Sequence, residues 1–173
     1  MSTRSDIISL CGDGMWRRVY CHFDGYLEGV GETLLNHYGD QAKVDSLVKL
    51  GDLSSLAENC DGAPGHSYSN RVDGQTVAYH RDRREPWSQV EPSEGSDLSS
   101  VWPAPKSWTE YTYVFAPTPG GSNEPSWWVG DPDLGPSSLT PLAMALADPA
   151  NYAPKPDIKA PWGVIGHRDE TRA

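Results

Sequence analysis

The stretch from Tyr20 to Tyr38, Y-C-H-F-D-G-Y-L-E-G-V-G-E-T-L-L-N-H-Y, constrains the fold more than any other part of the chain. Its first residues are typical of a strand, and Asp24-Gly25 ends that strand because Asp-Gly is strong turn chemistry. After Gly31, apolar residues recur at helical spacing as far as Tyr38. A strand therefore passes into a helix through a glycine-rich loop, so strands and helices must share one fold.

The glycine-rich loop has two interpretations that the sequence leaves open. Backbone N–H groups at a helix start are unpaired and can bind an anion. The acids Glu28 and Glu32 already suit the positive end of the helix, which favours plain turn and cap chemistry. Gly25 directly follows Asp24 in the turn, so we expect it to have a positive φ, which glycine adopts without steric cost.

A hairpin precedes this stretch, and its turn contains Gly-Asp-Gly. The two predicted strands and the turn are Asp6–Leu10, Met15–His22 and Gly12–Gly14. A two-residue turn places Ser5 opposite His22, whereas a three-residue turn places Arg4 there. With either register, the start of the chain lies beside His22.

Periodicity predicts further elements on both sides of a helical pair. The predicted helices are Glu32–Tyr38, Gln41–Leu50 and Ser137–Ala147, and the later strands are Thr76–His80, Trp108–Phe115 and Ser126–Val129. Strands flank the helices without regular alternation, which predicts an α+β fold. We expect an antiparallel sheet of two hairpins, covered by the helical pair. One domain spans residues 1–173, with a compact body over residues 1–147 and an extended Pro-rich tail over residues 148–173.

Composition limits the core and the partners. Phe occurs only twice, but 7 Trp and 8 Tyr supply large buried areas, so we expect a core rich in aromatic residues. The net charge of −10 argues against a protein that binds nucleic acid by neutralising phosphates. No apolar run is long enough to span a membrane and no signal region is visible, which predicts a cytoplasmic protein without membrane contact.

Cysteine and motif patterns give little support to cofactor chemistry. Cys11, Cys21 and Cys60 form no C-x-x-C pair, and the hairpin separates the first two, so we expect reduced, packed thiols. Two H-x-D doublets could supply metal ligands, but residues two apart share one face of any strand. We therefore predict no metal and no cofactor.

Polar residues at two strand ends form the candidate ligand site. Its predicted members are Arg4, His22, Asp24, Tyr26, His80, Arg81 and Asp82. The hairpin brings Arg4 to His22, and a guanidinium there would hold the Asp24 carboxylate through charge-assisted hydrogen bonds. Whether this cluster is functional or structural stays open. His66, within the irregular segment Ala57–Asp73, is expected to be solvated.

Four segments resemble a family of small phage and prophage proteins that carry T-R-S and Y-C-H-W-D-G-Y-P-x-G-V-G motifs. The matching segments are Thr3–Ser5, Tyr20–Gly31, Gly51–Leu56 and Tyr79–Arg83. Phe23 replaces the usual Trp and Leu27 the usual Pro. The resemblance covers roughly the first half of the chain and implies a phage accessory protein, without implying a mechanism.

Two functions follow as expectations, with no catalytic residue assigned. The first is a non-catalytic binding protein in the bacterial host cytoplasm that counters a host process such as antiviral defence, by blocking a host protein or sequestering a nucleotide-like signal. The second is a small hydrolase that acts on a phosphorylated small molecule through a His/Asp/Arg site. The absence of a recognisable nucleophile or metal motif favours the first.

Overall fold

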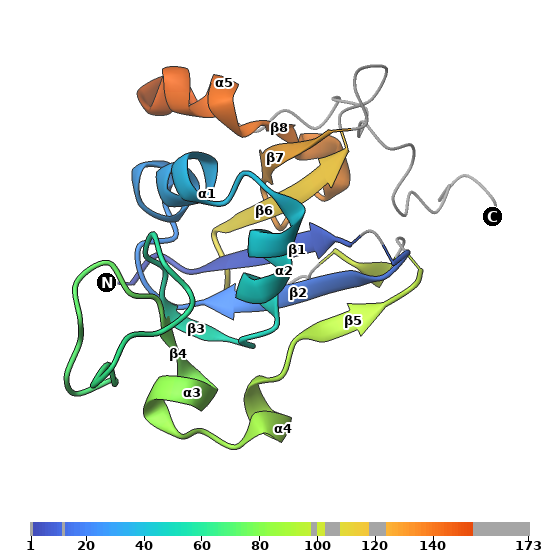
Figure 1. Cartoon of the computed structure of the whole chain (residues 1–173). Helices are drawn as coiled ribbons and strands as arrows, with labels where there is room; N and C mark the ends of the chain where they lie inside the picture. The colour runs from blue at the N-terminus through green and yellow to red at the C-terminus, as the bar shows by residue number, and fades with distance from the viewer. Residues whose placement is uncertain (1, 12, 98–99, 103–107, 118–123, 154–173) are drawn as a thin grey trace.

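The computed structural model describes residues 2–11, 13–97, 100–102, 108–117 and 124–153. Eight strands of this part of the chain form one sheet, in the order β4-β3-β2-β1-β6-β7-β8, with β5 paired to β2 (Figure 1). The strands are β1 Ser5–Leu10, β2 Trp16–Cys21, β3 Leu53–Ser55, β4 Val77–Ala78, β5 Ser93–Gly95, β6 Tyr111–Pro117, β7 Pro125–Gly130 and β8 Thr140–Pro141. Helices lie against this sheet, which confirms the α+β fold class.

Both predicted hairpins form, but the pair that joins them is parallel. β1 with β2 and β6 with β7 are antiparallel, whereas β1 with β6 and β2 with β3 are parallel. The expectation of an antiparallel sheet throughout is therefore wrong at these junctions. A long connection that crosses over lets a later strand enter the sheet in the same direction as an earlier one. The chain between β2 and β6 is long enough for this.

The hairpin register is the one with a three-residue turn. Ser5 pairs with Cys21, and the N–H of Cys11 donates to the carbonyl of Met15 at 2.8 Å. Continuing the register by one residue places Arg4 opposite His22.

Helices cover one face of the sheet (Figure 1). They are the π-helix η1 Leu27–Gly31, which runs directly into α1 Glu32–His37, then α2 Gln41–Val48 and α5 Leu142–Ala147. Asp40 caps α2 by accepting a hydrogen bond from the N–H of Lys43 at 2.9 Å. Their apolar residues pack with Tyr113, Phe115 and Trp127 in the larger core, where aromatic side chains contribute to a core that is otherwise mainly aliphatic.

The other face of the sheet has a smaller apolar core. Trp16, Val114 and Trp128 are buried there beside Val101 and Leu139. Trp127 and Trp128 do lie on opposite faces, but both are buried, so neither points outward. Cover comes from residues 101–102 and from the segment after the short helix η3 Pro136–Ser138.

The glycine-rich loop is a turn and not an anion site. Its N–H groups at Gly29, Val30 and Gly31 already donate to the carbonyls of Tyr26 and Asp24. Asp24 has the positive φ of 58°, so the expectation of a positive φ at Gly25 is wrong. Asn and Asp tolerate the left-handed region because their short polar side chains bond locally.

Gly25 is needed for space instead. A Cβ there would lie 2.9 Å from the carbonyl carbon of Arg4 and from the carbonyl oxygen of Thr3. The N–H of Gly25 donates to that same Thr3 oxygen at 2.9 Å. This contact ties the turn to the start of β1.

Three predicted elements differ in type or length. The predicted strand Thr76–His80 is only β4, because the helix α3 Tyr79–Arg83 begins directly after it. The predicted helix Ser137–Ala147 divides into η3, β8 and α5. The short helix α4 Trp87–Val90 follows α3, and the 3₁₀ helix η4 Pro149–Asn151 lies within the predicted tail. The rest of that tail, residues 154–173, falls outside the described residues.

Candidate functional site

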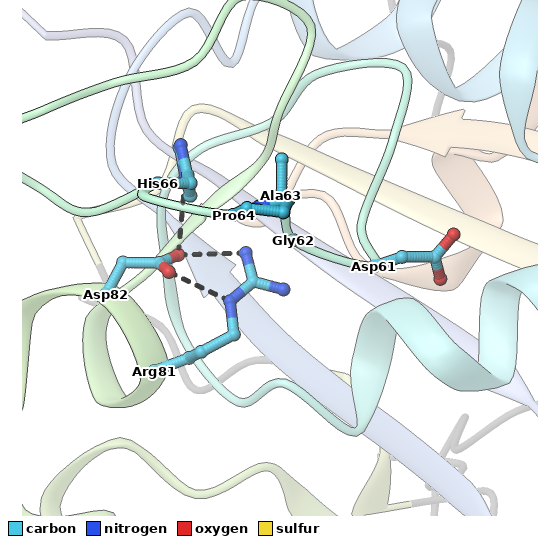
Figure 2. A pocket seen from close by; sticks show the side chains of 7 residues that line it. All are labelled: Asp61, Gly62, Ala63, Pro64, His66, Arg81 and Asp82. Carbon is cyan, nitrogen blue, oxygen red and sulfur yellow. Dashed lines mark hydrogen bonds and ion pairs between the residues drawn. The ribbon is translucent and has the colours of Figure 1, made fainter.

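A pocket of about 360 Å³ lies between α3 and the long loop that joins β3 to β4 (Figure 2). It is lined by Asp61, Gly62, Ala63, Pro64, His66, Arg81 and Asp82. Arg81 and Asp82 are therefore the members of the predicted site that reach a pocket. Asp61 and His66 also line the pocket but were not among the predicted site residues, because they lie in a loop that was expected to be irregular.

Arg81 and Asp82 form a fork-to-fork ion pair in this pocket. Nε and Nη2 of Arg81 each donate to one carboxylate oxygen of Asp82, at 2.9 Å in both cases. The Asp82 side chain is 3% exposed and also accepts from the N–H of Ala78 at 2.8 Å, at the start of α3. Both carboxylate oxygens thus accept hydrogen bonds from protein donors, and such paired, charge-assisted bonds are strong.

The guanidinium of Arg81 also donates hydrogen bonds to the long loop between β3 and β4. Nη1 of Arg81 donates to the carbonyl of Cys60 at 2.6 Å, and Nη2 donates to that of Thr76 at 2.8 Å. Gly62 passes close by with φ +80°, and a Cβ there would lie 3.3 Å from Nη1. Four of the five guanidinium N–H groups therefore donate to acceptors within this protein. The second N–H on Nη1 has no acceptor among the described contacts and can donate to a ligand in the pocket.

His66 is buried beside this pair, with its side chain 1% exposed. The backbone N–H of Val72 donates to Nδ1 at 3.0 Å, so Nδ1 carries the lone pair and Nε2 carries the proton. Nε2 faces Oδ2 of Asp82 at 3.7 Å (Figure 2). The expectation that His66 is solvated is wrong, because its side chain is buried between the loop and Asp82, where Nε2 has no hydrogen-bond partner among the described contacts.

Arg4 and His22 lie together on another part of the molecule, at the end of the first hairpin. The hydroxyl of Tyr20 and Nδ1 of His22 are 2.8 Å apart. Arg4 lies close to both residues: burial raises the pKa of Tyr20 and Arg4 opposes that rise, while burial and the charges of Arg4 and Arg83 lower the pKa of His22. The hairpin thus brings Arg4 to His22, as predicted.

Arg83 connects this hairpin end to further arginine and aromatic side chains. Its guanidinium carbon lies 4.9 Å from the centre of the Tyr68 ring and 5.6 Å from that of Tyr79. Arg71 lies 5.2 Å from the centre of the same Tyr68 ring. We define the arginine/aromatic surface as Arg4, His22, Phe23, Tyr68, Arg71 and Arg83.

The remaining predicted members do not join one cluster. Asp24 is exposed and forms no ion pair with Arg4 among the contacts of the described residues. Tyr26 is 41% exposed. His80 lies on the surface of α3, where its Nδ1 is 2.8 Å from the carbonyl of Glu85 and its ring meets Trp87 edge-on at 5.2 Å. The structure therefore places Arg81 and Asp82 in the pocket and Arg4 and His22 on the arginine/aromatic surface, and it leaves Asp24, Tyr26 and His80 outside both.

A buried aspartate, Asp6, and a partly buried one, Asp52, lie near Tyr20. Thr109 donates to Asp6 at 2.9 Å, and the N–H of Tyr20 donates to Asp52 at 2.9 Å. Burial, the largest cause, raises the pKa of each to about 6, against the opposing charge of Arg18. Neither could be predicted from the sequence, because both look like ordinary acids beside a strand.

The cysteines, the possible metal ligands and the helices of the described residues bear on other kinds of site. Cys11, Cys21 and Cys60 are free and buried. No group of three or more His, Cys, Asp or Glu residues that could hold a metal ion occurs within the described ranges. Of the described helices, none combines the length and apolar character needed to cross a membrane.

No family model, curated protein or solved structure matches this chain. The pocket and the arginine/aromatic surface are therefore the features that bear on function.

Proposed function

We propose that this chain is a non-catalytic binding protein of the phage accessory type. It acts in the cytoplasm of a bacterial host and counters a host process such as antiviral defence, by occupying a host protein or a nucleotide-like signal. The resemblance of its N-terminal half to small phage proteins supports the setting. The internal bonding of the pocket supports binding over catalysis.

The observation that carries this proposal is the state of the ionisable groups in the pocket. A general base must offer a lone pair to a substrate proton. The lone pair of His66 is already taken by the Val72 N–H, and both oxygens of Asp82 already accept hydrogen bonds. These contacts favour a structural role for both groups over that of a general base.

A small hydrolase acting on a phosphorylated molecule is the second candidate, and His80 favours it. The Glu85 carbonyl can only accept, so Nδ1 of His80 donates to it and Nε2 of the neutral ring keeps its lone pair. His80 is exposed, however, and no carboxylate orients its ring among the described contacts.

The test is to isolate the tagged chain from bacterial cells under native conditions and weigh its complexes by native mass spectrometry. The proposal predicts a stoichiometric complex with a host protein or with a chemically unchanged small molecule. Catalytic release of a cleaved phosphate product, followed by ³¹P NMR, would contradict it in favour of the hydrolase.

A further inference from the structure

The arginine/aromatic surface offers hydrogen-bond donors that the protein does not use. Arg83 pairs with Glu85 through Nε at 3.1 Å, which leaves both terminal nitrogens of its guanidinium without a hydrogen-bond acceptor among the described contacts. Arg71 donates from Nε to the carbonyl of Tyr68 at 3.4 Å, and its terminal nitrogens are likewise unspent there. Terminal guanidinium nitrogens are suited to phosphate oxygens, which they bind in pairs.

The local charge of this surface is positive, although the chain as a whole carries −10. His22 reports it, because its pKa is lowered by burial and by Arg4 and Arg83, and no carboxylate opposes them. Acids also lie beside these residues in the sequence. Glu85 is paired with Arg83 and Asp82 with Arg81, while Asp24 and Asp73 are exposed.

Flat rings accompany these arginines. Phe23 is 38% exposed and meets the His22 ring edge-on, with the ring centres 4.5 Å apart. Tyr68 is also 38% exposed, between Arg71 and Arg83. Exposed aromatic rings and guanidinium planes stack with nucleobases, and each such contact contributes to binding without regard to base identity.

The contrast between the negative net charge of the chain and the three arginines of this surface limits the size of the ligand. A long nucleic acid would extend beyond the three arginines onto a surface that is negative overall, and would be repelled. A small anion experiences mainly the charges within about 8 Å, the Debye length at physiological salt. A mononucleotide or a short oligonucleotide fits within that range.

We propose that the arginine/aromatic surface binds a nucleotide, with phosphate on Arg71 and Arg83 and the base against Phe23 and His22. This names the ligand class of the binding function proposed above and rests on it. The pocket lined by Arg81 and Asp82 has no part in this binding.

The probe is adenosine 5′-monophosphate, with adenosine and inorganic phosphate as separate titrants, in calorimetry and NMR on the full chain. The nucleotide is expected to bind more tightly than either part, and Arg83→Gln or Arg71→Gln to weaken it roughly tenfold, as expected for loss of a hydrogen bond to a charged group. Arg17→Gln, which removes an arginine paired with Asp13 and Glu94, is the matched control and is expected to leave affinity unchanged. Circular dichroism verifies that each variant is folded.

A second readout separates binding at this surface from binding elsewhere. A phosphate bound to Arg83 offsets one of the charges that lower the pKa of His22, so this pKa is expected to rise when the nucleotide is added. No binding by folded protein, equal loss in Arg17→Gln, or an unchanged His22 pKa would overturn the proposal. Binding of a poly-glutamate peptide in place of the nucleotide, with the same dependence on Arg83, would overturn it in favour of an acidic protein partner.

The two proposals fail in different ways. If the nucleotide does not bind but a stoichiometric host-protein complex is isolated, the binding function stands and only the ligand class is wrong. If the nucleotide binds and ³¹P NMR shows its turnover, the ligand class stands and the non-catalytic function is wrong.

Discussion

The pocket beside α3 and the arginine/aromatic surface use the same residue types in opposite ways. In the pocket, four N–H groups of Arg81 donate hydrogen bonds to Asp82 and to two backbone carbonyls. On the surface, Nε of Arg83 pairs with Glu85 and the guanidinium lies over aromatic rings. Its terminal nitrogens have no hydrogen-bond acceptor among the described contacts. A charged residue that lines a cavity thus has a structural role when most of its hydrogen-bonding groups are paired within the protein. A neighbouring charged residue outside the cavity can then be the better candidate for ligand binding.

The largest effect that this comparison predicts is on the pocket side. Asp82→Ala removes the carboxylate that holds Arg81, Ala78 and the long loop together. We expect the free energy of unfolding to fall by about 3 kcal/mol, the lower end for a broken buried pair because Arg81 is partly exposed. Urea denaturation measures the change. A loss below about 0.5 kcal/mol, the range of ordinary surface substitutions, would show that the pair is not structural.

The buried aspartate Asp6 predicts a pH dependence of stability. Folding raises the pKa of Asp6 from 3.8 to about 6, so the folded state holds a proton that the unfolded state releases. Stabilisation from this group is full below about pH 4 and is lost as the pH rises to about 6. The loss is roughly 3 kcal/mol for a shift of this size.

Asp6→Asn tests this directly, because it removes the titration while keeping an oxygen to accept the Thr109 hydrogen bond. The variant is expected to lose less stability than the wild type between pH 4 and pH 7 in urea denaturation. The matched control is Asp24→Asn at an exposed aspartate. Parallel pH profiles for the Asp6 variant and the wild type would contradict the raised pKa.

Gly25 tests the scaffold that sets Arg4 beside His22. Gly25→Ala forces a Cβ against the backbone of Thr3 and Arg4, and overpacking of this kind costs about 1 to 2 kcal/mol. Gly39→Ala is the control, because a Cβ there meets nothing within 4 Å. Thermal unfolding compares the two, and equal melting temperatures would mean that the turn can move away from β1.

The smallest predicted effect is a pKa change on the surface side. Arg83→Gln removes one of the two charges that lower the pKa of His22, so that pKa is expected to rise. NMR titration of the His22 ring measures it in the free protein. An unchanged pKa would show that Arg83 does not contribute to the field at His22.

Local patterns predicted much of the fold, and distant contacts explain the rest. The hairpin, the helical pair and the β6–β7 pair follow from turn residues and from periodicity within each segment. The parallel pairing of β1 with β6 could not be predicted this way, because it depends on residues about 100 positions apart. β3 and β5, of three residues each, are too short to show a period.

The candidate site was partly predictable for the same reason. Arg4 and His22 meet because hairpin arithmetic is local and holds for both registers. His66 could not be placed, since it lies in a loop without periodicity and is buried only by its approach to Asp82. Arg83 stands among the charged residues Arg81–Arg84 in the sequence, and only the fold brings it over Tyr68.

The most direct test compares Arg81→Gln with Arg83→Gln in the same two assays, urea denaturation and calorimetry with adenosine 5′-monophosphate. If the pocket is structural and the surface binds the ligand, Arg81→Gln lowers the free energy of unfolding and the folded protein keeps its affinity. Arg83→Gln then lowers affinity and keeps stability. The opposite result, with affinity lost in Arg81→Gln and kept in Arg83→Gln, would contradict the account.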